Sequence, residues 1–255
     1  MRHAVIVLIA VCCFGAFSFS QTVDELIAKN IEAKGGTEKM KAIKTVRMTG
    51  KFEGGDGFTA SIGQENQRPN LIRETFKLQG MTSVEAFDGT NGWQIQPFGG
   101  KKDPEMLGED DLRDLLLDAD FDGPLVDYKE KGNTVEYLGH DEVDGDDALR
   151  LKVTLKNGDL VYYYLDPDTF IEIRKEVQQF IRGSVRDHVV GLGSYKPVAG
   201  VMFPFSISRG PKNHPDEQTF TVQKIEVNVA IDPADFALPA SLKTEEKKSG
   251  IVGIH

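Results

Sequence analysis

The chain has 255 residues and carries 40 Asp and Glu against 30 Lys and Arg, so its formal net charge is −10. This excess of negative charge, with no cluster of cations along the chain, argues against nucleic acid as a partner, because phosphate contacts need clustered Lys and Arg. The two cysteines are adjacent, at Cys12 and Cys13. A thiol active site or a Cys-ligated metal elsewhere in the chain is therefore excluded.

Residues 1–20 have the layout of a secretory signal peptide. Arg2 precedes an apolar stretch, and Ser18 and Ser20 place small residues at the −3 and −1 positions of a cleavage site before Gln21. The apolar stretch is short for a bilayer span, and an uncleaved anchor is the alternative interpretation. We therefore expect an exported protein whose mature part lacks cysteine.

The first element after this segment is predicted to be an amphipathic helix. Thr22 and Glu25 have the spacing of a capping box, in which each side chain accepts a hydrogen bond from the backbone amide of the other. Apolar residues follow at helical spacing up to Ile31, and the pair Gly35-Gly36 ends the pattern. A second short helical piece is expected at residues 37–43.

From Val46 onward the apolar residues alternate with polar ones, which predicts strands. Short segments of this kind, joined by tight polar turns, are typical of an antiparallel meander. The five predicted strands are 46–52, 58–62, 72–78, 81–87 and 93–95.

A helix is then predicted to interrupt the strands. Asp103 can cap it and Pro104 suits its first position. Its apolar positions are spaced i, i+3, i+4 and i+7, at Leu112, Leu115, Leu116 and Ala119. Strands resume after a loop, and Asn157-Gly158 is a strong hairpin signal. The later strands are expected at 134–138, 149–155, 160–165, 170–180, 184–190, 201–208 and 219–229.

These elements predict a mainly β protein with a few helices (α+β). These antiparallel strands should curl into an incomplete barrel, with the helices covering its concave face. No linker divides the chain. We therefore expect one domain over residues 21–240, followed by a flexible charged tail at 241–255.

The segment 118–123 reads D-x-D-x-D-G, which is how a calcium loop opens. Its twelfth position should supply a bidentate Glu, but Lys129 stands there and Glu130 comes one residue late. We therefore predict that Asp118, Asp120 and Asp122 form a solvated acidic loop and no calcium site of physiological strength. No other metal or cofactor is predicted.

The sequence contains none of the common catalytic motifs, such as H-E-x-x-H, G-x-S-x-G or a P-loop. We therefore predict that the protein is not an enzyme. Scattered carboxylates could still meet in space, so a hydrolase of the glycosidase type stays open as an alternative.

The order of helix, meander, inserted helix and second meander resembles the bacterial outer-membrane lipoprotein-sorting proteins, the LolA/LolB-like group of periplasmic lipid carriers. Four stretches carry the resemblance: 24–43, the turn Asp88 to Trp93, 160–173, and 231–239 with its Asp-Pro-Ala-Asp-Phe segment. Their motifs are loose, because they contain turns and strands but no reactive group. The chain is longer than the dedicated carriers and lacks the lipid-modified Cys of the acceptor.

The resemblance implies a half-barrel whose concave apolar face holds acyl chains beneath helices that act as a lid. The expected function is a non-enzymatic carrier of lipid or acylated lipoprotein in the periplasm of a Gram-negative-type bacterium, with transient membrane contact. The alternative is an envelope sensor or protein-interaction module on the same fold. We predict a hydrophobic pocket wall made by Phe52, Phe58, Ile62, Phe76, Leu78 and Trp93.

Overall fold

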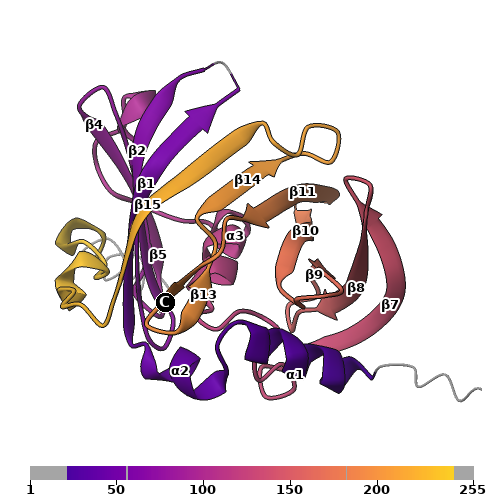
Figure 1. Ribbon diagram of the computed structural model, residues 1–255. Coiled ribbons are helices and arrows are strands. Elements are labelled where there is room, and N and C mark those ends of the chain that lie inside the picture. The colour runs from indigo at the N-terminus through magenta and orange to yellow at the C-terminus, as the bar shows by residue number, and fades with distance from the viewer. Residues whose placement is uncertain (1–21, 56, 182, 244–255) are drawn as a thin grey trace, which may run out of the picture.

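The computed structural model describes residues 22–55, 57–181 and 183–243, and its main element is one antiparallel sheet of thirteen strands (Figure 1). The order across the sheet is β6-β5-β4-β3-β2-β1-β15-β14-β11-β10-β9-β8-β7. The first six strands are β1 (Thr45–Gly54), β2 (Thr59–Gln67), β3 (Leu71–Leu78), β4 (Met81–Phe87), β5 (Gly92–Ile95) and β6 (Glu105–Met106). The others are β7 (Thr134–Val143), β8 (Asp146–Thr154), β9 (Leu160–Leu165), β10 (Glu172–Ile181), β11 (Ser184–Gly193), β14 (Ser206–Gly210) and β15 (Gln218–Val227).

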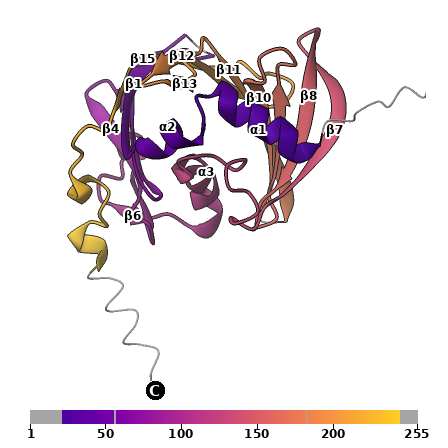
Figure 2. The same cartoon turned by 60° about the horizontal axis from the view of Figure 1, so that its bottom comes forward.

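The two ends of the sheet do not pair with each other, so the curl stays open. The link between its halves is the pairing of β1 with β15, which joins segments far apart in the sequence. Figures 1 and 2 show the sheet curving around an interior in which α3 (Glu109–Ala119) lies. The predicted fold class, a mainly β half-barrel with a few helices, is confirmed.

The first predicted helix is confirmed together with its cap. In α1 (Val23–Ala33) the hydroxyl of Thr22 accepts from the amide of Glu25 at 3.2 Å, and the Glu25 carboxylate accepts from the amide of Thr22 at 2.9 Å. Leu26 and Ile27 bury against the core of β8 and β9. α2 (Thr37–Ala42) continues along the same side. Among the described residues, no helix has the length and apolar character to span a bilayer.

The turn between α1 and α2 contacts a separate hairpin of β12 (Lys196–Val198) and β13 (Val201–Phe203). Gly35 has φ +118°, and a Cβ there would lie 2.2 Å from the carbonyl oxygen of Gly200. Only glycine fits this close approach of two backbones. The predicted strand 201–208 is thus two strands, β13 and β14, which Pro204 and Phe205 separate.

The inserted helix begins later than predicted. Glu105 and Met106 pair with Gln94 and Trp93 as β6, and α3 begins at Glu109 after Gly108, which makes no side-chain cap. The prediction at Asp103-Pro104 was wrong because backbone pairing with the open edge of β5 competes with helix formation there. The apolar stripe was correct: Leu115 and Ala119 pack on Ile72 and Phe87.

The opposite, convex face of the first meander is covered by the C-terminal segment. Trp93, Val84 and Ala86 pack with Leu238 and Leu242, which follow the short 3₁₀ helix η2 (Pro233–Asp235). A second 3₁₀ helix, η1 (Pro97–Gly99), follows β5. The predicted signal peptide and most of the predicted tail lie outside the described residues.

Candidate functional site

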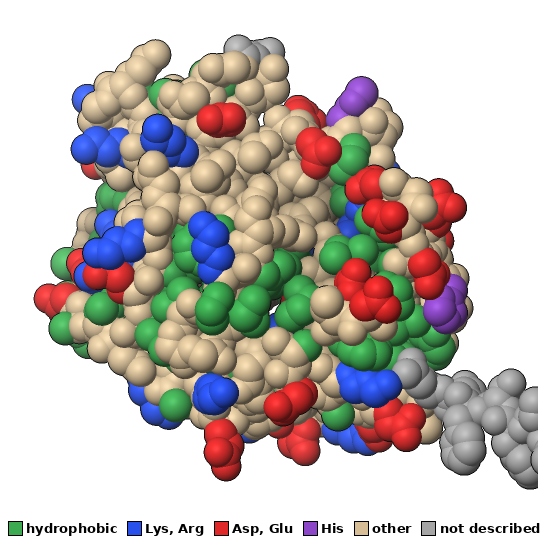
Figure 3. Space-filling model, viewed as in Figure 1, with side chains coloured by type: hydrophobic (Ala, Val, Ile, Leu, Met, Phe, Trp, Pro, Cys, Tyr) green, Lys and Arg blue, Asp and Glu red, His purple; other side chains and the backbone are tan. Residues whose placement is uncertain are grey.

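A cavity of about 470 Å³ lies on the concave side of the sheet, between the strands and α3. Figure 3 shows hydrophobic side chains gathered around a hollow near the centre of the face seen in Figure 1. The volume falls in the range of small-molecule binding sites. The cavity is therefore the candidate functional site.

One wall of the cavity is apolar. It is built mainly by β1, β15, β14 and β11, because alternate residues of each strand point to the concave face. Its side chains are Val46, Met48, Val190, Leu192, Phe203, Pro204, Ile207, Phe220, Val222 and Ile225. Each methylene of a ligand buried there gains about 0.8 kcal/mol.

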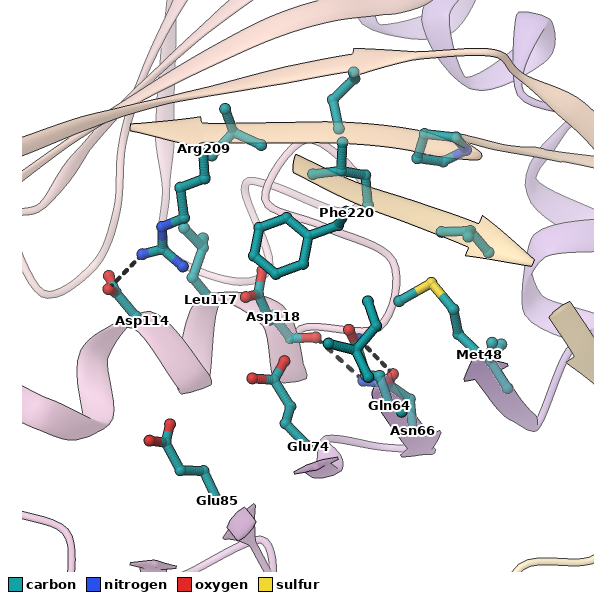
Figure 4. Close-up of a pocket in the computed structure, with 18 of the residues that line it drawn as sticks. Met48, Gln64, Asn66, Glu74, Glu85, Asp114, Leu117, Asp118, Arg209 and Phe220 are labelled. Atoms are coloured by element: carbon teal, nitrogen blue, oxygen red, sulfur yellow. Dashed lines mark hydrogen bonds and ion pairs between the residues drawn. The ribbon is translucent and has the colours of Figure 1, made fainter. Parts of the chain in front are cut away.

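The facing wall is polar and acidic (Figure 4). It is built by β2, β3, β4 and α3, and its polar side chains are Gln64, Asn66, Glu74, Thr75, Ser83, Glu85, Asp114 and Asp118. The Asn66 amide donates to the backbone carbonyl of Asp118 at 3.2 Å and accepts from Gln64 at 2.8 Å. These bonds tie the end of α3 to β2.

Two carboxyl groups of this wall are predisposed to hold a proton. Burial raises the pKa of Glu74 to about 8, and the neighbouring carboxylates of Asp118 and Glu85 add to the shift. Burial also raises the pKa of Asp118. Asp118 is nevertheless accessible from solvent, and Figure 4 shows its side chain directed into the cavity. Water and ligands can therefore reach both groups.

Asp114 is held by one cation and one side-chain amide. Its carboxylate accepts from Arg209 at 2.6 Å and from the buried Gln179 amide at 2.8 Å. Burial alone would raise the pKa of Asp114, but Arg209 and its other partners outweigh it and lower the pKa. Burial and the Arg209 charge lower the pKa of His188 to about 4, so this imidazole is neutral at neutral pH.

A second hollow of about 240 Å³ continues from the cavity toward α2. The two share seven lining residues, among them Leu117, Asp118 and Lys175. In this hollow the Lys34 ammonium pairs with Glu172 at 2.7 Å and closes the end near α1. The interior of the half-barrel is therefore one connected space beside α3.

The six predicted pocket residues divide between the two faces. Ile62 and Phe76 line the cavity. Phe52 and Phe58 stack beside them, with Phe52 5.1 Å from Phe76 between ring centroids. Leu78 lies at the end of β3, outside the lining.

Trp93 points the other way. Its indole N–H donates to the carbonyl oxygen of Phe236 at 3.0 Å on the convex face, where it belongs to the core. Trp93 therefore packs under the C-terminal segment and not in the predicted pocket wall.

The acidic wall was not predicted from the sequence, although one signal was present. Glu74 occupies an inward position between Ile72 and Phe76, where the alternation calls for an apolar residue. A charged residue on an otherwise apolar strand face marks a functional position more often than a packing one.

The three aspartates predicted to form a solvated loop have separate roles. Asp118 faces the cavity, Asp120 pairs with Lys131 at 2.5 Å, and Asp122 makes a two-pronged ion pair with Arg68. The interpretation as one solvated cluster was wrong, because the end of α3 turns each carboxylate toward a different neighbour. Over the described ranges, no group of three or more His, Cys, Asp or Glu side chains could hold a metal ion.

No family model matches the sequence, and no curated protein resembles it closely enough to be matched. Solved structures do share its fold. A DUF1329 family protein from Desulfovibrio piger aligns with a TM-score of 0.59 at 11% identity, over 86% of this chain and 98% of that one. A LolA superfamily protein from Nitrosomonas europaea aligns with a TM-score of 0.57 at 11% identity, over 86% and 99%.

A putative outer membrane lipoprotein-sorting protein domain from Vibrio parahaemolyticus aligns with a TM-score of 0.54 at 12% identity, over 82% of this chain and 97% of that one. At these identities the likeness concerns the fold. The chain therefore has a LolA-like fold, as its sequence resemblance predicted.

Proposed function

We propose that the protein is an exported, non-enzymatic carrier that binds the acyl chains of a lipid or lipoprotein in the cavity beside α3. The observation that supports this most is the continuous apolar wall on β1, β15, β14 and β11. Such a wall removes a hydrocarbon chain from water without needing a specific polar partner. Ile62 and Phe76 extend this surface at the end toward β2 and β3.

Two further features support a role in the envelope. The layout of residues 1–20 is that of a secretory signal peptide, which favours the periplasm as the working compartment. One of the similar structures is described as a lipoprotein-sorting domain. We therefore propose acylated lipoprotein or free lipid as cargo, with transient membrane contact during loading and release.

The proposal is tested with protein purified from the periplasm. Native mass spectrometry should find co-purified lipid, and delipidated protein should take up a fluorescent fatty acid. Leu117→Trp places a larger side chain in the cavity and should weaken uptake about tenfold or more. Leu138→Trp, at an exposed site on β7, is the matched control. Neither bound lipid nor uptake would reject the carrier, and a stoichiometric protein partner with an empty cavity would favour the sensor.

A further inference from the structure

Three neighbouring turns at one end of the sheet carry exposed apolar side chains. Phe58 directly before β2, Met81 at the start of β4 and Phe98 in η1 are 42%, 39% and 40% exposed. The strand pairings put these turns side by side, at the end of the sheet away from α1 and α2 (Figure 1). Leu78, which pairs with Met81 across the β3–β4 turn, adds a half-buried side chain. We call these four side chains the tip patch.

The tip patch is continuous with the cavity. Between ring centroids, Phe52 lies 5.3 Å from Phe58 and 5.1 Å from both Phe76 and Phe220. Phe98 lies 5.9 Å from Phe76. Because Phe76 and Phe220 line the cavity, a row of aromatic rings leads from the cavity to the exposed turns. A hydrocarbon chain that moves along this row keeps one side shielded from water.

Exposed lysines flank the tip patch. Within the described part of 51–60, 76–83 and 96–105, four lysines are set against three acidic residues, although the whole chain has a formal charge of −10. The lysines are Lys51, Lys77, Lys101 and Lys102, and the acidic residues are Glu53, Asp103 and Glu105. The β14–β15 turn adds Asp216 and Glu217 against Lys212 on the β1 side, away from Met81 and Phe98. The negative charge of the chain is therefore concentrated elsewhere, and an anionic headgroup layer can approach this end.

We propose that the tip patch inserts into a lipid bilayer and that acyl chains pass over it between the bilayer and the cavity. This inference rests on the proposed carrier function and adds the surface through which cargo is exchanged. A bilayer fits better than a protein partner because the apolar side chains stand on three separate turns, and each can enter a fluid layer without a matching groove. The flanking lysines then lie at the level of the headgroups.

Flotation with lipid vesicles tests the docking. Delipidated protein purified from the periplasm is mixed with vesicles made of equal parts of phosphatidylethanolamine and phosphatidylglycerol. Met81→Ser and, independently, Phe98→Ser should each weaken binding about tenfold, because each removes an exposed apolar side chain from the contact. Leu138→Ser changes a similarly exposed apolar residue on β7 and should leave binding unchanged as the matched control. The second variant keeps the test valid where the first does not fold.

A fluorescent label reports insertion directly. The sequence contains no cysteine after residue 20, so Met81→Cys and Leu138→Cys each provide a single thiol for a polarity-sensitive fluorophore. On addition of vesicles, the emission at position 81 should shift to the blue, whereas the emission at position 138 should stay as in water. The native side chains are 39% and 44% exposed, so a label that inserts through its own apolar character would shift at both positions.

The route of the cargo is measured with a fluorescent fatty acid that is offered either in solution or within the vesicles. Met81 does not line the cavity, so Met81→Ser should take up the dissolved fatty acid as the native protein does. Uptake from vesicles should be about tenfold slower, because this route needs the docked state.

The outcomes are distinct. Native protein that takes up dissolved fatty acid but binds no vesicles, or that shows no shift at position 81, overturns the bilayer docking and leaves the carrier function intact. Absence of uptake from both sources overturns the carrier function and the inference with it. Equal losses in Met81→Ser and Leu138→Ser overturn the assignment to the tip patch. A stoichiometric protein partner that is lost in Met81→Ser and Phe98→Ser, without vesicle binding, overturns the bilayer as the occupant.

Discussion

Arg68 joins three parts of the half-barrel, and its loss should weaken the attachment of α2 to β2 and to the end of α3. It follows β2, and its guanidinium donates to the carbonyl oxygens of Ile43 at 2.8 Å and Met40 at 3.0 Å at the end of α2. It also pairs with Asp122 after α3, at 2.7 Å, and stacks 4.3 Å from the Phe121 ring. Arg68→Met keeps an unbranched, largely aliphatic side chain and removes all of these hydrogen bonds.

The expected loss of stability follows from burial. The side chains of Arg68 and Asp122 are 20% and 12% exposed, so the variant leaves a largely buried carboxylate without its cation. Removing one partner of a buried pair costs about 3 to 5 kcal/mol, and partial exposure reduces this to about 2 to 3 kcal/mol. For a domain of this size, the melting temperature should fall by roughly 5 to 10 °C.

The same pair predicts a pH dependence. Burial alone would raise the pKa of Asp122, but the hydrogen bonds and charge of Arg68 outweigh it and hold the pKa below its usual value. A lowered pKa in the folded state gives stability that is present above about pH 4 and is lost as the pH falls through the folded pKa. The difference between native protein and Arg68→Met should therefore shrink in acid.

Urea unfolding followed by the fluorescence of Trp93, the single tryptophan, measures these changes. Arg174→Met is the matched control, because its partner Asp144 is 79% exposed and stays hydrated, so the loss should stay below about 1 kcal/mol. Equal losses in the two variants would refute the reasoning. So would a double-mutant cycle of Arg68→Met with Asp122→Asn that shows less than about 0.5 kcal/mol of coupling.

Three further changes have defined outcomes. Because the pKa of Glu74 is raised to about 8, the native state is increasingly destabilised as the pH rises through that value. Glu74→Gln should therefore have a higher urea midpoint than the native protein at pH 8.5. At pH 4 the two midpoints should be the same. Trp93→Phe leaves the buried carbonyl of Phe236 without its donor and should lower the free energy of unfolding by about 1 to 2 kcal/mol. Thermal unfolding followed by circular dichroism measures this loss. A change below about 0.5 kcal/mol would contradict the role of this hydrogen bond. Gly35→Ala puts a Cβ against the Gly200 carbonyl at a residue with a positive φ, and it should lower the free energy of unfolding by about 2 kcal/mol or more. An unchanged melting temperature would show that the two backbones can separate freely.

Local elements were predictable because short-range chemistry determines them. Each correctly predicted element depends on residues a few positions apart. Examples are the capping box of Thr22 and Glu25, the strands of the first meander and the hairpin at Asn157-Gly158. Where a distant partner intervened, prediction failed. Glu105 and Met106 were assigned to a helix because their pairing with β5 is invisible in local sequence.

The candidate site divides in the same way. Ile62 and Phe76 could be named because alternation puts them on an apolar face. Alternation does not reveal which face is concave, so Trp93, on the opposite face, looked equally suitable.

Short-range patterns in the sequence were enough to predict the class of the elements and the apolar alternation of the strands. The pairing of β1 with β15, the curl of the sheet around α3 and the meeting of Glu74 with Asp118 in one cavity become visible in the folded protein alone. The physical reason is that alternation has a period of two residues and fixes faces only relative to their own strand. Which faces meet depends on pairings between distant segments and on the twist that they accumulate.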